Sequence, residues 1–377
     1  MTRSRQETCR ATAEALRRLA PGLPATRAVL GFDGFVDEII AVVDQRHGPD
    51  HFDPVQSIAA MARKILGASG ESSNYELVVK HRKLGGNGPI MANALATLGL
   101  GVTYIGSLGH PNLDPVFDDF AARAEVISIA EPGQTDALEF ADGKLMLVKI
   151  GALAGVNWEN LIGRVGRDEL PRLMGGARLI GMLNWTMLPR MGEIWERLLA
   201  EVFPTFPEAE RTLFIDLADP EKRTRPDLRQ ALATISRFGE TVEVILGLNL
   251  KEATQVAEAL GLPGRADPEA AIEQDARAIR ESLGLGCVVI HPRKAAAAAT
   301  GSESASFPGP FVRDPKISTG AGDHFNAGFC LGRILGMGLE ESLCAGVASS
   351  GYYVRSASSA TAGELADFIA DLPAPEG

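Results

Sequence analysis

Short apolar runs alternate with amphipathic segments of helical spacing along most of the chain. The runs cover residues 28–32, 102–107, 177–183, 213–217, 242–246 and 287–290. The buried strands of a parallel sheet have this continuous apolar character because helices cover both of its faces. The pattern predicts an α/β protein with a mostly parallel central sheet, formed as one large domain over residues 1–377.

Two segments, residues 38–86 and 125–150, depart from this rhythm. In the first, Asp53 as N-cap and Pro54 at the first helical position predict the start of a helix. The second alternates apolar and polar residues on either side of Asp142-Gly143, a dipeptide typical of β-hairpins. We interpret both segments as insertions that form a small β-containing lid. Whether the lid covers a substrate or is inert decoration stays open.

A run of small residues, Gly320, Ala321 and Gly322, precedes a predicted helix over residues 325–337. Their N–H groups therefore gather at a helix N-terminus, where negative charge is stabilised. Asp323, at the same turn, is suited to accept a proton from an attacking hydroxyl. An anion hole beside a base indicates phosphoryl transfer to an alcohol, although Asp is also a common N-cap of ordinary turns.

Two carboxylates follow the first apolar run of the chain. Asp33 and Asp37 come directly after residues 28–32, and ligands of open parallel sheets bind beyond the carboxyl ends of the strands. Carboxylate oxygens accept hydrogen bonds from the hydroxyls of a sugar, so both residues are candidates for acceptor binding. The alternatives are that Asp33 only caps a turn and that Asp37 is solvated.

A glycine-rich turn, Gly85-Gly86-Asn87, opens a later helical segment. Its glycines allow the backbone to approach a ligand closely. Asn87 both donates and accepts hydrogen bonds at the mouth of the helix, as binding of a sugar hydroxyl requires. Gly85, Gly86 and Asn87 are therefore further candidates for acceptor binding.

Asn249 and Glu252 lie three residues apart where an apolar run passes into a helix. A Glu at this place can hold the waters of a bound Mg²⁺, which keeps several of its own waters in protein sites. The same spacing also fits a capping box, with Asn249 as cap and Glu252 at the third helical position. The two interpretations are compatible.

Composition narrows the classes of function. The net charge of −11 argues against a nucleic-acid-binding surface, and the scattered Cys and His residues have no spacing typical of a metal site. No stretch has the apolar length of a membrane span, and the N-terminus has no signal-peptide pattern. We expect a cytoplasmic protein whose partners are small molecules.

In this order, the motifs resemble the ribokinase superfamily of carbohydrate kinases, which includes the phosphofructokinase-B type. The resemblance covers nearly the whole chain and implies a three-layer α/β/α sandwich with a small β-containing lid. It implies that Asp323 is the catalytic base and that Gly320–Gly322 form the anion hole. It also implies that Asn249 and Glu252 help to organise Mg²⁺, through water, and the phosphates.

The resemblance further divides the remaining candidates between two ligands. It implies that Asp37 and the turn at Gly85-Gly86-Asn87 hold the acceptor sugar. The nucleotide is expected against the apolar wall of the large domain, along a helix at residues 342–353 and the loop after Pro292. The remaining candidates for nucleotide binding are His291, Arg293, Thr319 and Ser350.

The chain departs from the pattern of the superfamily at several positions. Ile317 stands where an acidic residue often opens the C-terminal signature, Ile90 replaces an expected Asn, and His291-Pro292-Arg293 replaces a Thr-x-Gly turn. Residues 31–37, residues 89–93 and His291 look more like the ADP-dependent sugar kinases of the same superfamily, whereas residues 319–328 look closer to its ATP-dependent members. ATP is the favoured phosphoryl donor, with ADP as the alternative.

The sequence leaves the acceptor open between sugars and nucleosides. Alternative activities are an ADP-dependent sugar kinase or a nucleoside kinase of the same fold, and a ligand-sensing protein with this fold that transfers no phosphate. A dinucleotide-dependent oxidoreductase is disfavoured because no Gly-x-Gly-x-x-Gly follows the first apolar run. Lid strands with free edges also suggest a homodimer formed through the lid.

Overall fold

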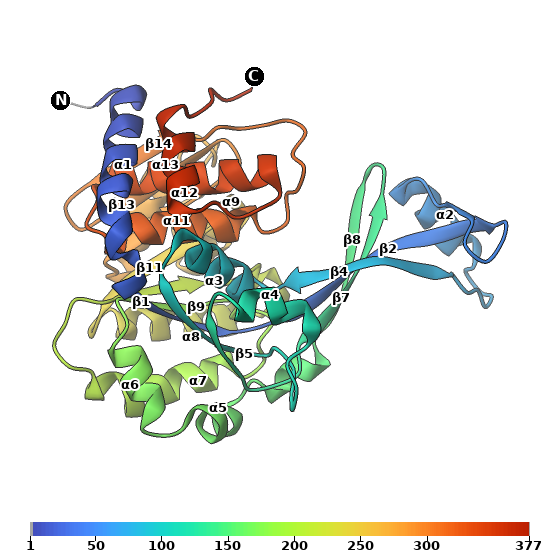
Figure 1. The fold of residues 1–377 in the computed structure, drawn as a ribbon, viewed down its shortest axis with the longest axis horizontal. Helices are drawn as coiled ribbons and strands as arrows, with labels where there is room; N and C mark the ends of the chain where they lie inside the picture. Colours follow the sequence, from blue (N-terminus) through green and yellow to red (C-terminus); the bar gives the residue numbers. More distant parts are fainter. Residues whose placement is uncertain (1–2, 377) are drawn as a thin grey trace.

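The computed structural model describes residues 3–376, which contain two β-sheets and the helices that flank them (Figure 1). The strands of the larger sheet are β1 (Arg27–Phe32), β5 (Gly101–Gly106), β6 (Glu125–Ser128), β9 (Leu179–Met182), β10 (Thr212–Asp216), β11 (Glu243–Leu248), β12 (Cys287–Ile290), β13 (Ala295–Thr300) and β14 (Ser304–Pro308). They lie in the order β14-β13-β12-β11-β10-β9-β1-β5-β6.

The neighbouring strands from β12 to β6 in this order all pair in parallel, whereas β13 and β14 add an antiparallel edge. Each of the six apolar runs forms a strand of this sheet. The prediction of a mostly parallel central sheet is therefore confirmed.

Helices cover both faces of the larger sheet. They are α1 (Arg5–Leu19), α3 (Asn87–Leu98), α4 (Asp118–Ala121), α5 (Trp158–Val165), α6 (Glu169–Gly175), α7 (Met191–Arg197), α8 (Arg225–Phe238), α9 (Leu250–Ala259), α10 (Ile272–Leu283), α11 (Ala321–Ile334), α12 (Leu339–Ser356) and α13 (Ala362–Ala370). Helices α5 to α10 pack on one face, and α1, α3, α4, α11, α12 and α13 pack on the other.

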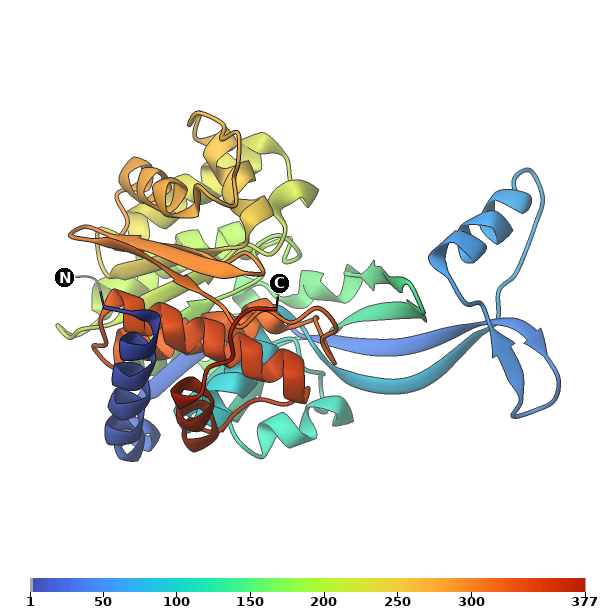
Figure 2. The same ribbon diagram turned by 90° about the horizontal axis from the view of Figure 1, so that it is seen from above.

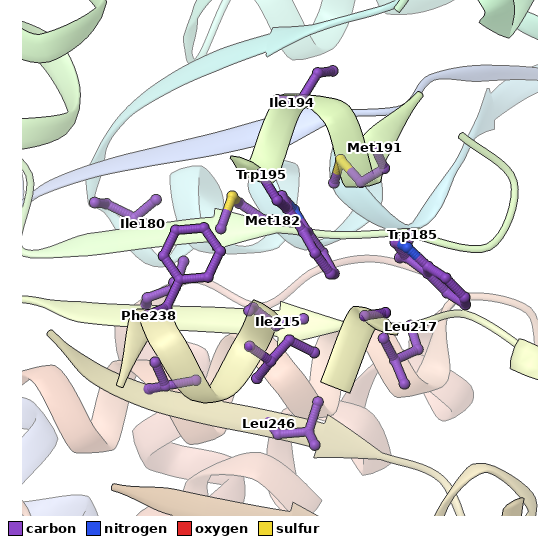
Figure 3. Packing of buried hydrophobic residues seen from close by; sticks show 14 of the residues in the cluster. Ile180, Met182, Trp185, Met191, Ile194, Trp195, Ile215, Leu217, Phe238 and Leu246 are labelled. Carbon is purple, nitrogen blue, oxygen red and sulfur yellow. The ribbon is translucent and has the colours of Figure 1, made fainter. Parts of the chain in front are cut away.

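Alternate side chains of one strand enter different cores, which is the period of two expected of a strand. Leu213 and Ile215 of β10 join the core under α5 to α10, whereas Phe214 joins the opposite core. Figure 3 shows the first core, where the ring of Trp195 meets that of Phe238 edge to face with centroids 6.4 Å apart. The large domain is a three-layer α/β/α sandwich.

The smaller sheet extends away from the large domain (Figures 1 and 2). Its elements are β2 (Phe35–Arg46), β3 (Phe52–Pro54), β4 (Leu77–Gly85), β7 (Gly133–Phe140) and β8 (Gly143–Lys149), with α2 (Ile58–Gly67) near the tip. We call residues 35–85 and 133–149 the lid. A small core of its own, which includes Ile40, Met61 and Phe140, holds α2 against the strands.

The hairpin predicted at Asp142-Gly143 is confirmed, since β7 and β8 pair antiparallel up to Phe140 and Gly143. The helix start predicted at Asp53 and Pro54 is wrong. These residues form the short edge strand β3 against β2, where a Pro is tolerated, and α2 begins at Ile58 with Ser57 as its N-cap.

The second predicted insertion also began too early in the chain. Residues 125–128 form β6, which pairs with β5 of the large sheet, so the second lid segment starts at residue 133. No helix within residues 3–376 combines the length and the apolar character needed to cross a bilayer.

Candidate active site

The carboxyl ends of parallel strands meet the N-termini of α3 and α11 at one edge of the large sheet. Asp33 follows β1, Asp216 ends β10, Asn249 follows β11 and His291 follows β12. Open parallel sheets bind ligands at this edge, because the loops and helix N-termini converge there. The lid leaves the large domain from the same edge, since β2 begins two residues after Asp33.

A tight turn leads into α11. The N–H of Ala321 donates to the carbonyl of Ser318 over 3.2 Å, and Gly320 has φ +91° and ψ 0°. These values are those of the third residue of a type II turn, a conformation that favours glycine. The helix therefore starts at Ala321, four residues before the predicted start at Phe325.

Because of this turn, only two of the three N–H groups expected to form the anion hole are free. The N–H of Ala321 already donates to Ser318, whereas no acceptor within residues 3–376 binds the N–H of Gly320 or of Gly322. Both free groups lie at the N-terminus of α11, where the helix dipole attracts an anion. Gly320 and Gly322 are thus the available donors, and Ala321 is used by the turn itself.

Asp323 lies in the first turn of α11 and is buried. Its Oδ1 accepts a hydrogen bond from Nδ2 of Asn87, at 3.0 Å, across the junction of α3 and α11. Burial raises the pKa of Asp323 to about 8; the bond from Asn87 opposes this shift, and the charges of Asp33 and Glu252 add to it. Its high basicity suits a group that takes up a proton.

The carboxylate of Asp33 is held mainly by groups of the protein itself. It accepts from the N–H groups of Asn87 and Gly88 and from Nδ2 of Asn184, whereas the hydroxyl of Tyr104 donates to the main-chain carbonyl of Asp33 at 2.7 Å and lies 3.3 Å from Oδ1. Burial raises the pKa of Asp33 to about 6 despite these bonds. This geometry favours the capping alternative, in which Asp33 holds the N-terminus of α3, over a direct contact with the acceptor.

Asp37 points from β2 toward the base of the lid. A Cβ built at Gly85 would lie 2.5 Å from its carboxylate, so the glycine leaves the space that Asp37 occupies. Lys83 on β4 and Thr135 on β7 are the cross-strand partners of Asp37. Burial raises the pKa of Asp37, although a hydrogen bond from Thr135 and the charge of Lys83 oppose the shift.

Tyr353 of α12 lies near both candidate carboxylates. Burial, together with the charges of Asp323 and Asp37, raises the pKa of Tyr353 to about 12. The turn Gly85-Gly86-Asn87 links the two carboxylates, because Asp37 lies against Gly85 and Asn87 binds Asp323. Lys83, Thr135 and Tyr353 are missing from the sequence-based candidates because strand pairing and helix packing bring them near these carboxylates.

The side chain of Glu252 is buried. Its carboxylate accepts from the N–H of Asn249 at 2.9 Å and of Asp219 at 2.8 Å, and the side chain of Asn249 accepts from the N–H of Glu252. The capping box is therefore present. Burial raises the pKa of Glu252.

Asp216 is a further buried carboxylate that the motifs did not single out. Its Oδ2 accepts from Nδ2 of Asn326 at 3.0 Å. Burial raises its pKa well above the usual value, and the charges of Glu252 and Asp323 add to the shift. The signal in the sequence was an acid near the end of the apolar run 213–217, a position that a buried strand rarely gives to a charge.

A cavity of about 400 Å³ lies beside the N-terminus of α11, and no lid residue is part of its lining. Its lining includes Asn249, His291, Arg293, Gly322 and Ser350. Of the predicted nucleotide-site residues, Glu252 and Thr319 are not part of this lining.

His291 is a half-buried polar residue of this cavity. Burial lowers its pKa to about 4, so the ring is neutral at pH 7, and it packs on Phe325 with centroids 4.6 Å apart. Its Nε2 is buried and has no hydrogen-bond partner among the described residues. A ligand that fills the cavity would supply the missing partner.

Comparison with known proteins also indicates a sugar kinase. A family model described as prokaryotic ketohexokinase matches residues 4–372. A curated ketohexokinase from Haloferax volcanii is 31% identical over 365 residues, which cover 96% of each chain.

Solved carbohydrate kinases share the fold. The phosphofructokinase-2 of Escherichia coli has a TM-score of 0.63 at 15% identity and covers 92% of this chain and 99% of its own. The ribokinase of Arabidopsis thaliana has a TM-score of 0.60 at 16% identity, with coverage of 91% and 98%. These similarities confirm the ribokinase-like fold that the motifs predict.

Proposed function

The chain belongs to the prokaryotic ketohexokinase family, and on this premise we propose that it transfers the γ-phosphoryl group of ATP to a primary hydroxyl of a ketohexose. Membership of this family establishes that the protein is a sugar kinase, an enzyme that transfers phosphate to an alcohol. The finer proposal concerns the acceptor, the donor and the residues that act on them. The observation that carries it is Asp323, a buried carboxylate of raised pKa bonded to Asn87 at the N-terminus of α11.

Asp323 serves as the general base. The acceptor hydroxyl lies between its carboxylate and the terminal phosphorus, and Asp323 takes the proton as the new P–O bond forms. Asn87 holds one carboxylate oxygen, which leaves the other free to face the acceptor. The burial that raises the pKa of Asp323 also makes it a stronger base.

Gly320 and Gly322 stabilise charge on the transferred group. Their free N–H groups are donors that need no rearrangement during the reaction, and they act in a site partly shielded from water. The helix dipole of α11 adds to their effect at this terminus. Loss of a single donor of this kind in other enzymes costs on the order of 10²–10³-fold in rate.

Three buried carboxylates, Asp216, Glu252 and Asp323, lie around the site; the charges of Glu252 and Asp323 raise the pKa of Asp216, and the charge of Glu252 raises that of Asp323, as expected where a cation is to be bound. No set of three His, Cys, Asp or Glu side chains within residues 3–376 converges closely enough to hold a metal directly. This donor set fits Mg²⁺ held through its waters by Asp216 and Glu252. Bound Mg²⁺ would neutralise phosphate charge.

The nucleotide occupies the cavity beside Gly322. Its phosphates face Asn249 and the unpartnered Nε2 of His291, while the base rests against apolar residues near Ser350. Arg293 lies beside Phe311 at the mouth of the cavity and contributes positive charge. The structurally similar ribokinase of Arabidopsis thaliana was solved with ribose and ATP, which supports ATP as donor.

The acceptor lies under the lid. Asp37 accepts from sugar hydroxyls, and Asn87 both donates and accepts beside the base. Lys83 and Thr135 hold Asp37 from the neighbouring strands. Closure of the lid over this space would exclude water and so limit hydrolysis of the nucleotide.

The experiment that tests this proposal is a coupled assay of the purified protein with Mg²⁺. Fructose, glucose, ribose and adenosine are compared as acceptors, with ATP and ADP each tested as donor. We expect the highest kcat/KM with fructose and ATP, and a product that carries phosphate on a primary hydroxyl. Turnover only with ADP, or only with an aldose or a nucleoside, would contradict the proposal.

We also propose that two chains pair through the lid. Among the described residues, every large apolar side chain that is more than 40% exposed lies in or next to the lid: Ile65, Leu66, Leu77, Val79, Met146, Leu147 and Ile150. Apolar side chains gathered on a projecting element typically mark a contact surface. The sheet also offers an edge strand, β8, whose one partner among the strands of residues 3–376 is β7.

A further inference from the structure

In the turn at residues 318–321, the orientation of the central peptide decides where the N–H of Gly320 points, and this N–H is one of the two free donors of the proposed anion hole. In a type II turn, the central peptide here joins Thr319 to Gly320, and the dihedrals of Gly320 identify this type. The peptide is planar and trans, so the carbonyl of Thr319 and the N–H of Gly320 point in opposite directions. Fixing the carbonyl therefore fixes the donor.

Nothing within the turn itself holds this central peptide. Type I and type II turns share the bond between their first and fourth residues and differ mainly in the orientation of the central peptide. A flip would turn the N–H of Gly320 to the opposite side while the bond from Ala321 to Ser318 survived. The direction of the Gly320 donor thus depends on contacts from outside the turn.

Tyr353 of α12 supplies such a contact. Its hydroxyl donates to the carbonyl of Thr319 over 3.0 Å. A Cβ built on Gly320 would lie 3.2 Å from the same hydroxyl, so the Tyr353 side chain lies directly against the turn. The N–H of Gly320 consequently points away from Tyr353.

His324 holds the next peptide. Its ring stacks on that of Tyr353, with centroids 3.6 Å apart and planes 13° from parallel. Its Nδ1 lies 2.8 Å from the carbonyl of Gly320, which can only accept, so Nδ1 carries the proton. Its Nε2 then accepts from the hydroxyl of Ser359, at 2.9 Å.

The imidazole is neutral in this arrangement. Burial lowers the pKa of His324 to about 4, and its two ring nitrogens already have a carbonyl and a hydroxyl as partners. The stacked pair therefore joins three segments: the turn, α12 and the stretch after α12 that contains Ser359.

We propose that Tyr353 and His324 are positioning residues, which lock the Thr319–Gly320 peptide so that the N–H of Gly320 faces the transferred phosphoryl group. The inference rests on the proposed phosphoryl transfer and deepens it. Neither residue needs to touch the reacting atoms, because each acts through a carbonyl of the turn. They lower the energy of the transition state, because the donor that they orient stabilises the charge that develops on the phosphoryl oxygens.

The test is Tyr353→Phe, which removes the hydroxyl and keeps the ring on His324. Tyr352→Phe is the matched control, because Tyr352 is the neighbour in the same helix and its ring packs on Phe368. We expect kcat of Tyr353→Phe to fall by about 10- to 100-fold, with the KM for the ketohexose within about twofold of the unchanged protein. Tyr352→Phe should retain kcat, and the melting temperatures of the two variants should be similar.

A second readout reports on the transition state without turnover. Aluminium fluoride with ADP, Mg²⁺ and the sugar mimics the phosphoryl group in transit. The affinity of Tyr353→Phe for this mimic should fall about as much as kcat, while its affinity for ADP alone stays unchanged.

Two outcomes would overturn the positioning role of Tyr353 and leave the proposed function intact. One is an unchanged kcat in Tyr353→Phe. The other is a raised KM for the sugar with unchanged kcat, which would make Tyr353 a ligand of the acceptor. By contrast, a wild-type protein that phosphorylates no sugar would overturn the proposed function, and the inference with it.

Discussion

At the scale of single residues, Asp323 stands where a carboxylate is costly. It is buried, and the charges of Asp33 and Glu252 act against its ionisation. Asn87 provides only partial compensation. Groups held at such a cost cluster at functional sites, because the same environment that penalises the charge tunes the group for proton transfer.

The first prediction concerns the pH dependence of the reaction. A general base acts only when ionised, and the pKa of Asp323 is raised from 3.8 to about 8. We therefore expect kcat/KM for the acceptor to rise with pH on a limb centred near that value, and to be low at pH 5. Initial rates across a pH series check this, with separate confirmation that the protein stays folded. A profile that is flat from about pH 5 to 9 would contradict the assignment.

At the scale of elements, local sequence patterns predicted the features that depend on neighbouring residues and missed those that depend on strand pairing. The glycines Gly320 and Gly322 predicted a helix N-terminus at this turn, although α11 begins at Ala321, four residues before the predicted start. The cap at Asp53 failed because pairing of β3 with β2 outweighed a local helix signal. Residues 125–128 were assigned to the lid because an isolated strand does not reveal the sheet that it joins.

The lid carries a prediction of its own. If its exposed apolar side chains form a dimer interface, light scattering should give twice the 40.0 kDa chain mass. Replacing Leu66 and Leu147 together by Lys should shift the mass to that of one chain, because buried unpaired charges disfavour association. Gln274→Lys, on the surface of α10, is the control. Wild-type protein that is monomeric throughout would contradict the proposal.

At the scale of the whole molecule, the sequence was sufficient to predict the large sheet and those candidate site residues that lie within a single motif. Each apolar run became a strand, because continuous burial leaves a clear pattern. The missed residues Asp216, Lys83, Thr135 and Tyr353 come from four different elements. Only the assembled fold brings them to the site, and no local spacing records such long-range proximity.

The same scale explains why stability and activity should diverge at residue 323. In the unfolded chain Asp323 ionises near its usual pKa of 3.8, whereas in the folded protein it keeps its proton up to about pH 8. The fold therefore loses stability as pH rises between these values. Asn has no such cost, so Asp323→Asn should melt at a higher temperature than wild type at pH 8, with a smaller difference at pH 5.

The most direct test of the account is the single-turnover rate of phosphoryl transfer from ATP to fructose in Asp323→Asn at pH 8. Asp371→Asn, at the exposed end of α13, is the control and should retain the wild-type rate. We predict a loss on the order of 10²–10⁴-fold in Asp323→Asn, with nucleotide affinity preserved. A rate within a few-fold of wild type would contradict the assignment of Asp323 as the base.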